Sequence, residues 1–358
     1  MAGHSASRPQ SPKTPVLIDM WHLGPEVSNS ELTLSLLEVA ESIHTKNLGG
    51  LWYFMFCRAP DHERKDKEQL ERVLKDLYCG EVMGAETYAA TLYAVKQKLD
   101  ENGVEKFTVL VSWERKSLVR KYMEQLFTRL YQYELIELPM SSKEKHLKKP
   151  WESSKAGPHI DPEVEGIQKE ISQFLESLPS LKGDLAILKS SLIPGHIFLH
   201  GFTTRTGGIS YVSTLSSLNL FSSSKRRDPP AVVKENLRRL AHVAGFNPEM
   251  YHSIKVNHAS DVWVMGQPQP ESYDGIVTNQ RGIIVAAPGA DCIPLVFADP
   301  VKKVCGAAHS GNQISVVLTQ LPKHDKPSVV KQMFPLLEAP TALAKIFSLS
   351  RCRLKLIY

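Results

Sequence analysis

Two residues of metal-ligating type stand at predicted strand ends in one apolar stretch of the chain, residues 282–311. Three short apolar runs in this stretch, separated by Pro, Gly and Asp, predict consecutive buried strands at 283–287, 293–298 and 304–308. Cys292 stands at the start of the second run and His309 at the end of the third. If these strands share a sheet, a thiolate and an imidazole meet at one edge. One further His would then complete a three-ligand zinc site with an open fourth position.

The residues alone leave other interpretations of this pair open. A free Cys is most often a small buried hydrophobic residue, and a His at a strand end is most often a satisfied surface residue. Cys292 is also a candidate thiol nucleophile, with His258 or His309 as its base. His258, in the segment VNHASDVW, and the nearby His252 both compete as the third metal ligand. The pattern does not separate these two.

A second stretch whose residues could bind a ligand or take part in catalysis is HGFTTRTGGIS, which begins at His200. Arg205 offers a planar cationic fork suited to phosphate, and Gly207 and Gly208 allow backbone N–H groups to approach an anion. The competing interpretation is a Gly-Gly hairpin turn with Arg205 in a surface salt bridge. The residues favour neither. The basic residues of the later Ser/Pro-rich loop, at 225–227, are interpreted as solvated.

The elements that must position these residues alternate between strands and helices. Strands are predicted at 16–19, 51–57 and 107–111, and helical spacing of apolar residues appears at 32–43, 88–99 and 118–130. This alternation predicts a small α/β domain over residues 15–139. It contains no Gly-rich dinucleotide fingerprint and no P-loop, so we interpret it as a scaffold or interaction domain. Its Cys57 and Cys79 are expected to pack rather than to react.

The rest of the chain divides by composition. Residues 1–14 are predicted to be a disordered N-terminus, and the Lys-, Ser- and Pro-rich residues 140–160 a linker. A second domain is predicted over 161–311, with amphipathic helices at 167–178 and 232–244. Residues 312–358 form a basic tail, which holds seven of the 43 basic residues but only two of the 38 acidic ones. The rest of the chain is balanced in charge, which argues against a nucleic-acid partner.

The composition is that of a globular protein, with 42% hydrophobic and 23% charged residues in a chain of 358. Five Cys without framework spacing predict free thiols in a reducing compartment, hence the cytoplasm, with the nucleus or an organelle surface as further locations. The most apolar stretch is interrupted by Asp291 and two Pro, so no membrane span is expected.

Six motifs follow one another in the chain in the order in which one protein family carries them. They are HGFTTRTGGIS, SLNLF with VKENLRRLA, VNHASDVW, YDGIVTN, GADCIPLVFAD and CGAAHSG. Over about residues 190–311 the chain thereby resembles the laccase-domain (multicopper polyphenol oxidoreductase-like) purine nucleoside phosphorylase family. The resemblance implies a partial mixed β-sheet sandwich flanked by helices, which follows the small N-terminal α/β domain. It also implies zinc held by His258, Cys292 and His309, and phosphate near Arg205, with His200, Gly207 and Gly208 in the same motif.

The activity implied by the resemblance is phosphorolysis of adenosine, inosine, guanosine or 5′-methylthioadenosine to base and ribose 1-phosphate, together with deamination of adenosine. The partners implied are purine nucleosides and phosphate. In the family, His309 would be followed by Gly-Trp-Lys/Arg-Gly, whereas this chain continues with Ser310, Gly311 and Asn312. A divergent or replaced C-terminus is therefore expected after Gly311. With it we expect sheet edges without partners and weak or absent activity.

Two functions of other classes are weighed against this one. A copper-dependent phenol oxidase needs several coppers and closely paired His, and none of the 13 His forms an H-x-H pair, so copper is the less favoured metal. A non-catalytic interaction protein would instead bind a protein partner, or a second copy of itself, through its N-terminal domain.

Overall fold

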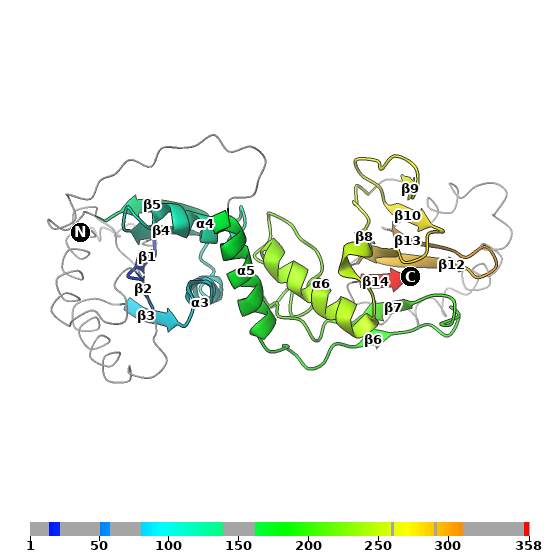
Figure 1. Cartoon of the computed structure of the whole chain (residues 1–358), viewed down its shortest axis with the longest axis horizontal. Helices are drawn as coiled ribbons and strands as arrows, with labels where there is room; N and C mark the ends of the chain where they lie inside the picture. Colours follow the sequence, from blue (N-terminus) through cyan, green and yellow to red (C-terminus); the bar gives the residue numbers. More distant parts are fainter. Residues whose placement is uncertain are drawn as a thin grey trace, which may run out of the picture. The chain divides into compact units, whose positions relative to one another are not determined.

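The computed structural model describes residues 14–21, 51–57, 80–138, 162–258, 261–289, 292–310 and 354–357. The chain divides into two compact units (Figure 1). Unit 1 comprises Met1–Ser177 with Ser223–Ala231, and unit 2 comprises Leu178–Ser222 with Val232–Tyr358. The helix predicted at 32–43, Cys79, the linker at 140–160 and most of the basic tail lie outside the described residues.

Unit 1 contains a five-stranded sheet in the order β3-β2-β1-β4-β5, and every neighbouring pair in it is parallel. The central strand β1 is fully buried, as expected for a parallel sheet with both faces covered. The predicted strands at 16–19, 51–57 and 107–111 are confirmed. The outer strands β3 and β5 were not predicted, because their sequences GEVMGA and QYELIE are Gly-containing or charged. The strands are β1 (Val16–Asp19), β2 (Trp52–Cys57), β3 (Gly80–Ala85), β4 (Lys106–Val111) and β5 (Gln132–Glu137).

Three helices are described in unit 1, namely α3 (Tyr88–Glu101), α4 (Lys116–Leu126) and α5 (Pro162–Ser177). The side chain of Thr87 caps α3 by accepting a hydrogen bond from the amide of Ala90, a favourable N-cap arrangement. Helix α5 lies in the range that the sequence assigns to the second domain. In the structure it packs in unit 1, where the ring of Phe174 contacts that of Tyr93 at 5.5 Å and Glu170 accepts a hydrogen bond from the amide of Ala89.

A buried ionic network in unit 1 corrects the interpretation of residues 225–227 as solvated for Arg227 alone, since Lys225 and Arg226 are exposed. Arg227 donates to Asp100 at 2.7 Å and to Glu105 at 2.9 Å, and its guanidinium lies over the ring of Tyr131. Lys96 is fully buried, and its Nζ lies 2.8 Å from the second carboxylate oxygen of Asp100. Burial lowers the pKa of Lys96, and Asp100 opposes that shift. Arg227 is therefore held because a buried carboxylate needs charged partners.

Unit 2 contains two mixed sheets that share one apolar core, as the predicted sandwich requires. One sheet has the order β12-β13-β10-β9 and the other β6-β7-β14-β11-β8. Ile276 and Ala307 from the first sheet cluster with Val285 from the second. The strands are β6 (Ile187–Leu188), β7 (His200–Thr203), β8 (Tyr251–Ser253), β9 (Val262–Val264), β10 (Gly275–Thr278), β11 (Ile284–Pro288), β12 (Ile293–Asp299), β13 (Val304–Ser310) and β14 (Leu354–Ile357), and a 3₁₀ turn η2 spans Pro248–Met250.

The basic tail contributes strand β14 to the second sheet. Leu356 is paired on one side with Gly201 of β7 and on the other with Ala286 of β11, antiparallel to both. Sheet edges without partners were expected in this domain, and at β7 and β11 strand β14 supplies the partner. None of the helices in the described part of the chain is long and apolar enough to cross a membrane.

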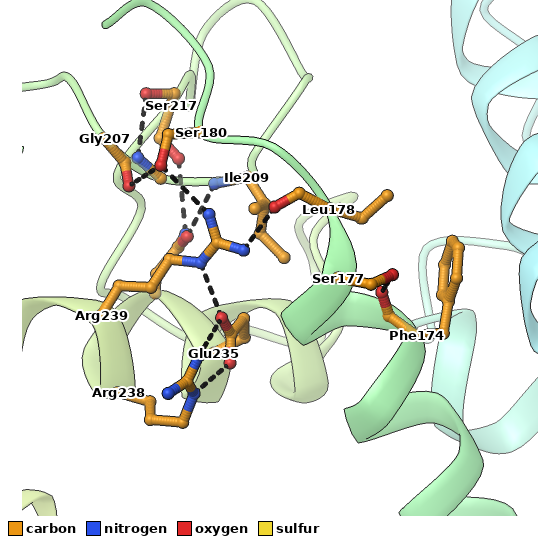
Figure 2. A network of polar contacts seen from close by, with 12 residues as sticks. Phe174, Ser177, Leu178, Ser180, Gly207, Ile209, Ser217, Glu235, Arg238 and Arg239 are labelled. Carbon is orange, nitrogen blue, oxygen red and sulfur yellow. Dashed lines mark hydrogen bonds and ion pairs between the residues drawn. The ribbon is translucent and has the colours of Figure 1, made fainter. Parts of the chain in front are cut away.

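Helix α6 (Pro230–Ala244) fastens the segment that precedes β7 to the segment that follows it. Figure 2 shows Glu235 between Arg238 and Arg239, and Arg239 donates onward to the carbonyl of Leu178 at 2.6 Å. Asn236 is fully buried. It accepts from the amide of Ile209 at 2.9 Å and donates to the carbonyl of Asn219 at 2.9 Å. The motif VKENLRRLA thereby holds HGFTTRTGGIS and SLNLF together.

We expect Asn236→Ala to lower the free energy of unfolding of unit 2 by about 1–3 kcal/mol. The substitution leaves the buried amide of Ile209 without its acceptor. A buried donor without an acceptor destabilises the folded state by the full free energy of its desolvation. Urea denaturation measures the change. Lys234→Ala, at an exposed position of the same helix, is the matched control and should change stability little. Equal effects of the two substitutions would contradict this role of Asn236.

Candidate metal centre

His258, Cys292 and His309 come together in unit 2. One ligand atom from each, a ring nitrogen or the Sγ, lies within 4.8 Å of the others. His258 is exposed, Cys292 is half-buried and His309 is buried, so the group opens to solvent on one side. The ring centroids of His258 and His309 are 5.1 Å apart. A thiol and two imidazoles in this arrangement are a donor set that suits a zinc-like ion.

The β12–β13 hairpin places two members of this cluster. Its antiparallel register pairs Pro294 with His309, so Cys292, which immediately precedes β12, lies at the same end of the hairpin as His309. At the other end, Asp299 accepts hydrogen bonds from the amides of Val301 and Lys302 and fixes the turn. Because the turn sets the register, it also sets which residues face each other at the open end.

A buried carboxylate, that of Asp274, joins His258 to His309. It accepts from the backbone amides of Asn257 and His258, each at 3.2 Å, and its Oδ1 lies 3.3 Å from Nδ1 of His309. Its own carbonyl accepts from the amide of His309 at 2.8 Å. Asp274 therefore orients both His residues although they come from different segments.

The contact at Nδ1 of His309 leaves Nε2 as the ring atom available to a metal. Metal-ligating His residues commonly use their second nitrogen in this way, towards a carboxylate that fixes the ring. His258 stands in the left-handed backbone region, with φ of 61°. This conformation is costly for a residue with a Cβ, and the hydrogen bond from its amide to Asp274 holds it there.

The donor atoms are close to the spacing that a tetrahedral ion requires. With zinc–nitrogen and zinc–sulfur bonds of roughly 2.0–2.3 Å, ligand atoms stand roughly 3.5 Å apart. The present limit of 4.8 Å is thus about 1.3 Å wider, a difference that small side-chain rotations span. The residues fit a metal ion in type, number and spacing.

The rival candidates for this cluster lie elsewhere. The ring of His252 packs edge-on against Trp263 at 5.9 Å, and burial lowers the pKa of His252. Cys305 is buried in the apolar core, and burial raises the pKa of its thiol to about 11, so this cysteine is inert. The structure thus groups His258, rather than His252, with Cys292 and His309.

Arg205 of the Gly-rich motif is engaged by its own loop. Its Nε donates to the carbonyl of Ser216 at 3.0 Å, and its Nη2 donates to those of Ser213 and Thr214 at 3.2 and 3.4 Å. These bonds hold the guanidinium at a fixed orientation. The side chain is half-buried, so part of the cation still faces solvent.

His200 and the two glycines of this motif also make internal contacts. The His200 ring lies between the backbone of Ser190 and the carbonyl of Phe198. The amide of Gly207 donates to Leu181, and that of Gly208 approaches the hydroxyl of Ser217. A Cβ at Gly207 would stand 2.4 Å from Leu185, and one at Gly208 would stand 2.1 Å from the carbonyl of Ser217. Close backbone approach is therefore the reason for glycine at both positions.

Asp274 is the site residue that the sequence did not reveal. It stands in the motif YDGIVTN, directly before β10, where a lone Asp also fits an ordinary turn. The pairing of Gly275 in β10 with Ala308 in β13 brings it beside His309. Only this pairing between distant segments gives the carboxylate its role.

Comparison with known proteins shows what the segment that carries the cluster is similar to. Residues 199–317 match the family model of the multi-copper polyphenol oxidoreductase laccases. The match includes all three members of the metal-ligating cluster as well as Asp274 and Arg205. The site described above therefore lies within this matched segment, which is called the laccase-type domain below.

Curated relatives are similar to the chain over part of its length. The chain is 55% identical over 231 residues to purine nucleoside phosphorylase LACC1 of Homo sapiens, which covers 64% of this chain and 53% of the relative. It is 59% identical over 223 residues to purine nucleoside phosphorylase LACC1 of Mus musculus, and this match covers 62% of this chain and 51% of the relative. Purine nucleoside phosphorylase of Deinococcus radiodurans is 40% identical over 114 residues, and this match covers 31% of this chain and 43% of the relative. The chain thus spans about half the length of the curated relatives it matches.

We expect Asp274→Asn to weaken zinc binding by 10- to 100-fold. The side-chain NH₂ of the introduced Asn would face backbone N–H donors, and the ring of His309 would lose its carboxylate partner. Competition with a chromophoric chelator measures the affinity. Asp299→Asn changes a buried carboxylate in the same sheet that serves the hairpin turn, and it should retain zinc. Unchanged affinity in Asp274→Asn would refute the positioning role.

Proposed function

We propose that the laccase-type domain of this chain is a purine nucleoside phosphorylase whose active site is built on His258, Cys292 and His309. The observation that carries the proposal is the convergence of these three ligands around Asp274, in a segment whose relatives are named purine nucleoside phosphorylases. The reaction is the attack of phosphate on the anomeric carbon of a purine nucleoside, which releases the base and forms ribose 1-phosphate, or its 5-methylthio derivative from 5′-methylthioadenosine. Adenosine, inosine, guanosine and 5′-methylthioadenosine are the proposed substrates.

Zinc is the metal that this donor set favours. One thiolate and two imidazoles leave a fourth position open, and copper sites of the oxidase type use further His or a thioether. Zinc held there would supply a Lewis acid and would lower the pKa of a water molecule. The protein's own contribution is to orient the rings, since Asp274 fixes His309 through Nδ1 and His258 through its amide. Deamination of adenosine is proposed for the same site.

Arg205 is the residue that we propose for phosphate. A guanidinium presents five N–H donors, and the contacts with residues 213, 214 and 216 hold it in place before a substrate arrives. Such preorganisation favours catalysis because the cation need not be ordered during the reaction. Phosphate binding by His200, Gly207 and Gly208 stays a prediction from sequence, as do a cytoplasmic location and a homodimer or protein partner through the N-terminal domain.

The proposal predicts phosphate-dependent release of base from inosine and adenosine by the purified, zinc-loaded chain. The weak activity expected from the divergent C-terminus stays a prediction, which the rate in the same assay tests. His258→Ala and Cys292→Ala should each abolish turnover and reduce bound zinc, because each removes one of three ligands. Cys305→Ala is the matched control, since this thiol packs in the core and should not be needed. Base release can be followed by chromatography with and without phosphate. Full activity of Cys292→Ala would exclude the proposed site.

For Arg205, we expect Arg205→Lys to raise the KM for phosphate at least tenfold while the KM for inosine changes little. Lysine keeps the charge but cannot reproduce the planar fork or the contacts with three carbonyls. Steady-state kinetics at varied phosphate separate this outcome from a loss of folding, which would lower kcat and thermal stability together. A KM for phosphate like that of the unsubstituted chain would remove Arg205 from the phosphate site.

A further inference from the structure

The parallel sheet of unit 1 has a point at which its strand order reverses. From β1 the chain fills β2 and β3 on one side, and then crosses to β4 and β5 on the other. Strands β1 and β4 are therefore neighbours whose connections lead away in opposite directions. In open α/β sheets, ligands bind outside the carboxyl ends of the strands at such a point.

Charged and hydroxyl side chains gather at this place. Asp19 is the last residue of β1, and Ser112 directly follows β4. Arg115 belongs to the same turn as Ser112, since its amide donates to the carbonyl of Ser112 at 3.2 Å. Its Nε donates to Oδ2 of the fully buried Asp19 at 2.7 Å, which joins the two strand ends. The other oxygen of Asp19 accepts from the amide of Trp21.

Three polar atoms at this place are buried and make no hydrogen bond of ordinary geometry in the described part of the chain, namely Nη2 of Arg115, Oγ of Ser112 and Oη of Tyr88. The Arg115 guanidinium and the Tyr88 hydroxyl do lie close enough to interact with each other. Tyr88 is 4% exposed, and the Arg115 guanidinium lies 5.0 Å from the centre of its ring. Burial raises the pKa of Tyr88 and the charge of Asp19 adds to the shift, so the hydroxyl is protonated. Buried donors without partners are rare in proteins, and three in one place indicate a missing acceptor.

The donors define the chemistry of that acceptor. Nη2 of Arg115 can only donate, and both hydroxyls can donate as well, so a single group with several acceptor oxygens would satisfy all three. Asp19 already neutralises Arg115, which suits a small oxyanion rather than a polyphosphate. The ring of Trp21 lies edge-on to Tyr88 at 5.4 Å and adds an apolar wall.

The nearby helix end is already occupied by the protein itself. Glu170 of α5 accepts from the amide of Ala89 at 2.9 Å, in the first turn of α3, and from the hydroxyl of Tyr122. A carboxylate at this position stabilises the positive end of the helix. The acceptor sought by Arg115, Ser112 and Tyr88 is therefore a different one.

We propose that the carboxyl ends of β1 and β4 form a binding site for a small molecule that carries a phosphate or carboxylate group, held by Arg115, Ser112 and Tyr88. This site belongs to unit 1, whereas the metal-ligating cluster belongs to unit 2. The N-terminal domain is then a ligand-binding module as well as a scaffold.

The test is hydrogen–deuterium exchange on the full chain, titrated with inorganic phosphate or with acetate. Either anion should slow exchange in peptides that cover 14–21 and 106–126, compared with chloride at equal ionic strength. Protection by phosphate alone assigns a phosphate-bearing ligand, and protection by acetate alone assigns a carboxylate. Protection must persist in Arg205→Lys, which weakens the phosphate site proposed for the laccase-type domain and so separates the two sites. No protection by either anion beyond that of chloride would overturn the proposal.

Ser112→Ala and Tyr88→Phe supply the second readout. Ser112→Ala removes a hydroxyl without a hydrogen bond of ordinary geometry, and Tyr88→Phe removes one that lies beside Arg115, which Asp19 already pairs, so thermal stability without added anion should change little. Anion affinity should fall at least fivefold in each variant. If instead both variants lower thermal stability without anion and leave the affinity unchanged, the hydroxyls serve the fold and the proposal fails.

Discussion

The acceptor capacity of one buried carboxylate, that of Asp274, determines the geometry of the laccase-type domain's site. Two backbone amides and one imidazole nitrogen converge on its oxygens from a loop and from a strand that lie far apart in the sequence. Since each donor is constrained by its own chain segment, their shared acceptor fixes the segments relative to one another. The strained backbone of His258 and the ring orientation of His309 both depend on it. The β10–β13 pairing keeps this carboxylate in place, because the backbone of Asp274 itself bonds to His309.

How much of this arrangement could be predicted follows from the range of the interactions. Three apolar runs separated by turn residues predict β11, β12 and β13, and a hairpin necessarily brings Cys292 and His309 to one end. The choice of His258 over His252 came only from resemblance, because both stand near strand ends. Asp274 escaped prediction since its role depends on a register between β10 and β13 that no local pattern contains. For the same reason Arg227 was predicted to be solvated, although it donates a hydrogen bond to Asp100, more than a hundred residues earlier in the chain.

The motif HGFTTRTGGIS shows how one sequence pattern can serve fold and chemistry at once. Its glycines are explained by the backbone, since a side chain at either position would collide with a neighbouring segment and Gly207 also has a φ of 86°. The amides of both glycines are already hydrogen-bonded, and Asn236 completes the network from α6. What remains for chemistry is the cation of Arg205, which the same loop holds rigidly. A tightly bonded loop around one oriented charge is what electrostatic catalysis requires, because reordering during the reaction would consume the stabilisation gained.

The surroundings of Asp274 and of Asp19 differ in how completely their buried polar groups are paired, and that difference separates positioning from recognition. In unit 2, every described contact of the Asp274 carboxylate is internal, so this residue orients other groups and has no need of a ligand. In unit 1, Asp19 is likewise paired with Arg115, but the far side of that guanidinium and two hydroxyls are not. A fold tolerates the desolvation of such donors only if something restores the lost bonds, either a rearrangement of the same side chains or a bound acceptor. Because β1 and β4 fix Asp19 and Ser112 at the reversal of the sheet, the backbone leaves little room for rearrangement, and a bound acceptor accounts better for all three atoms.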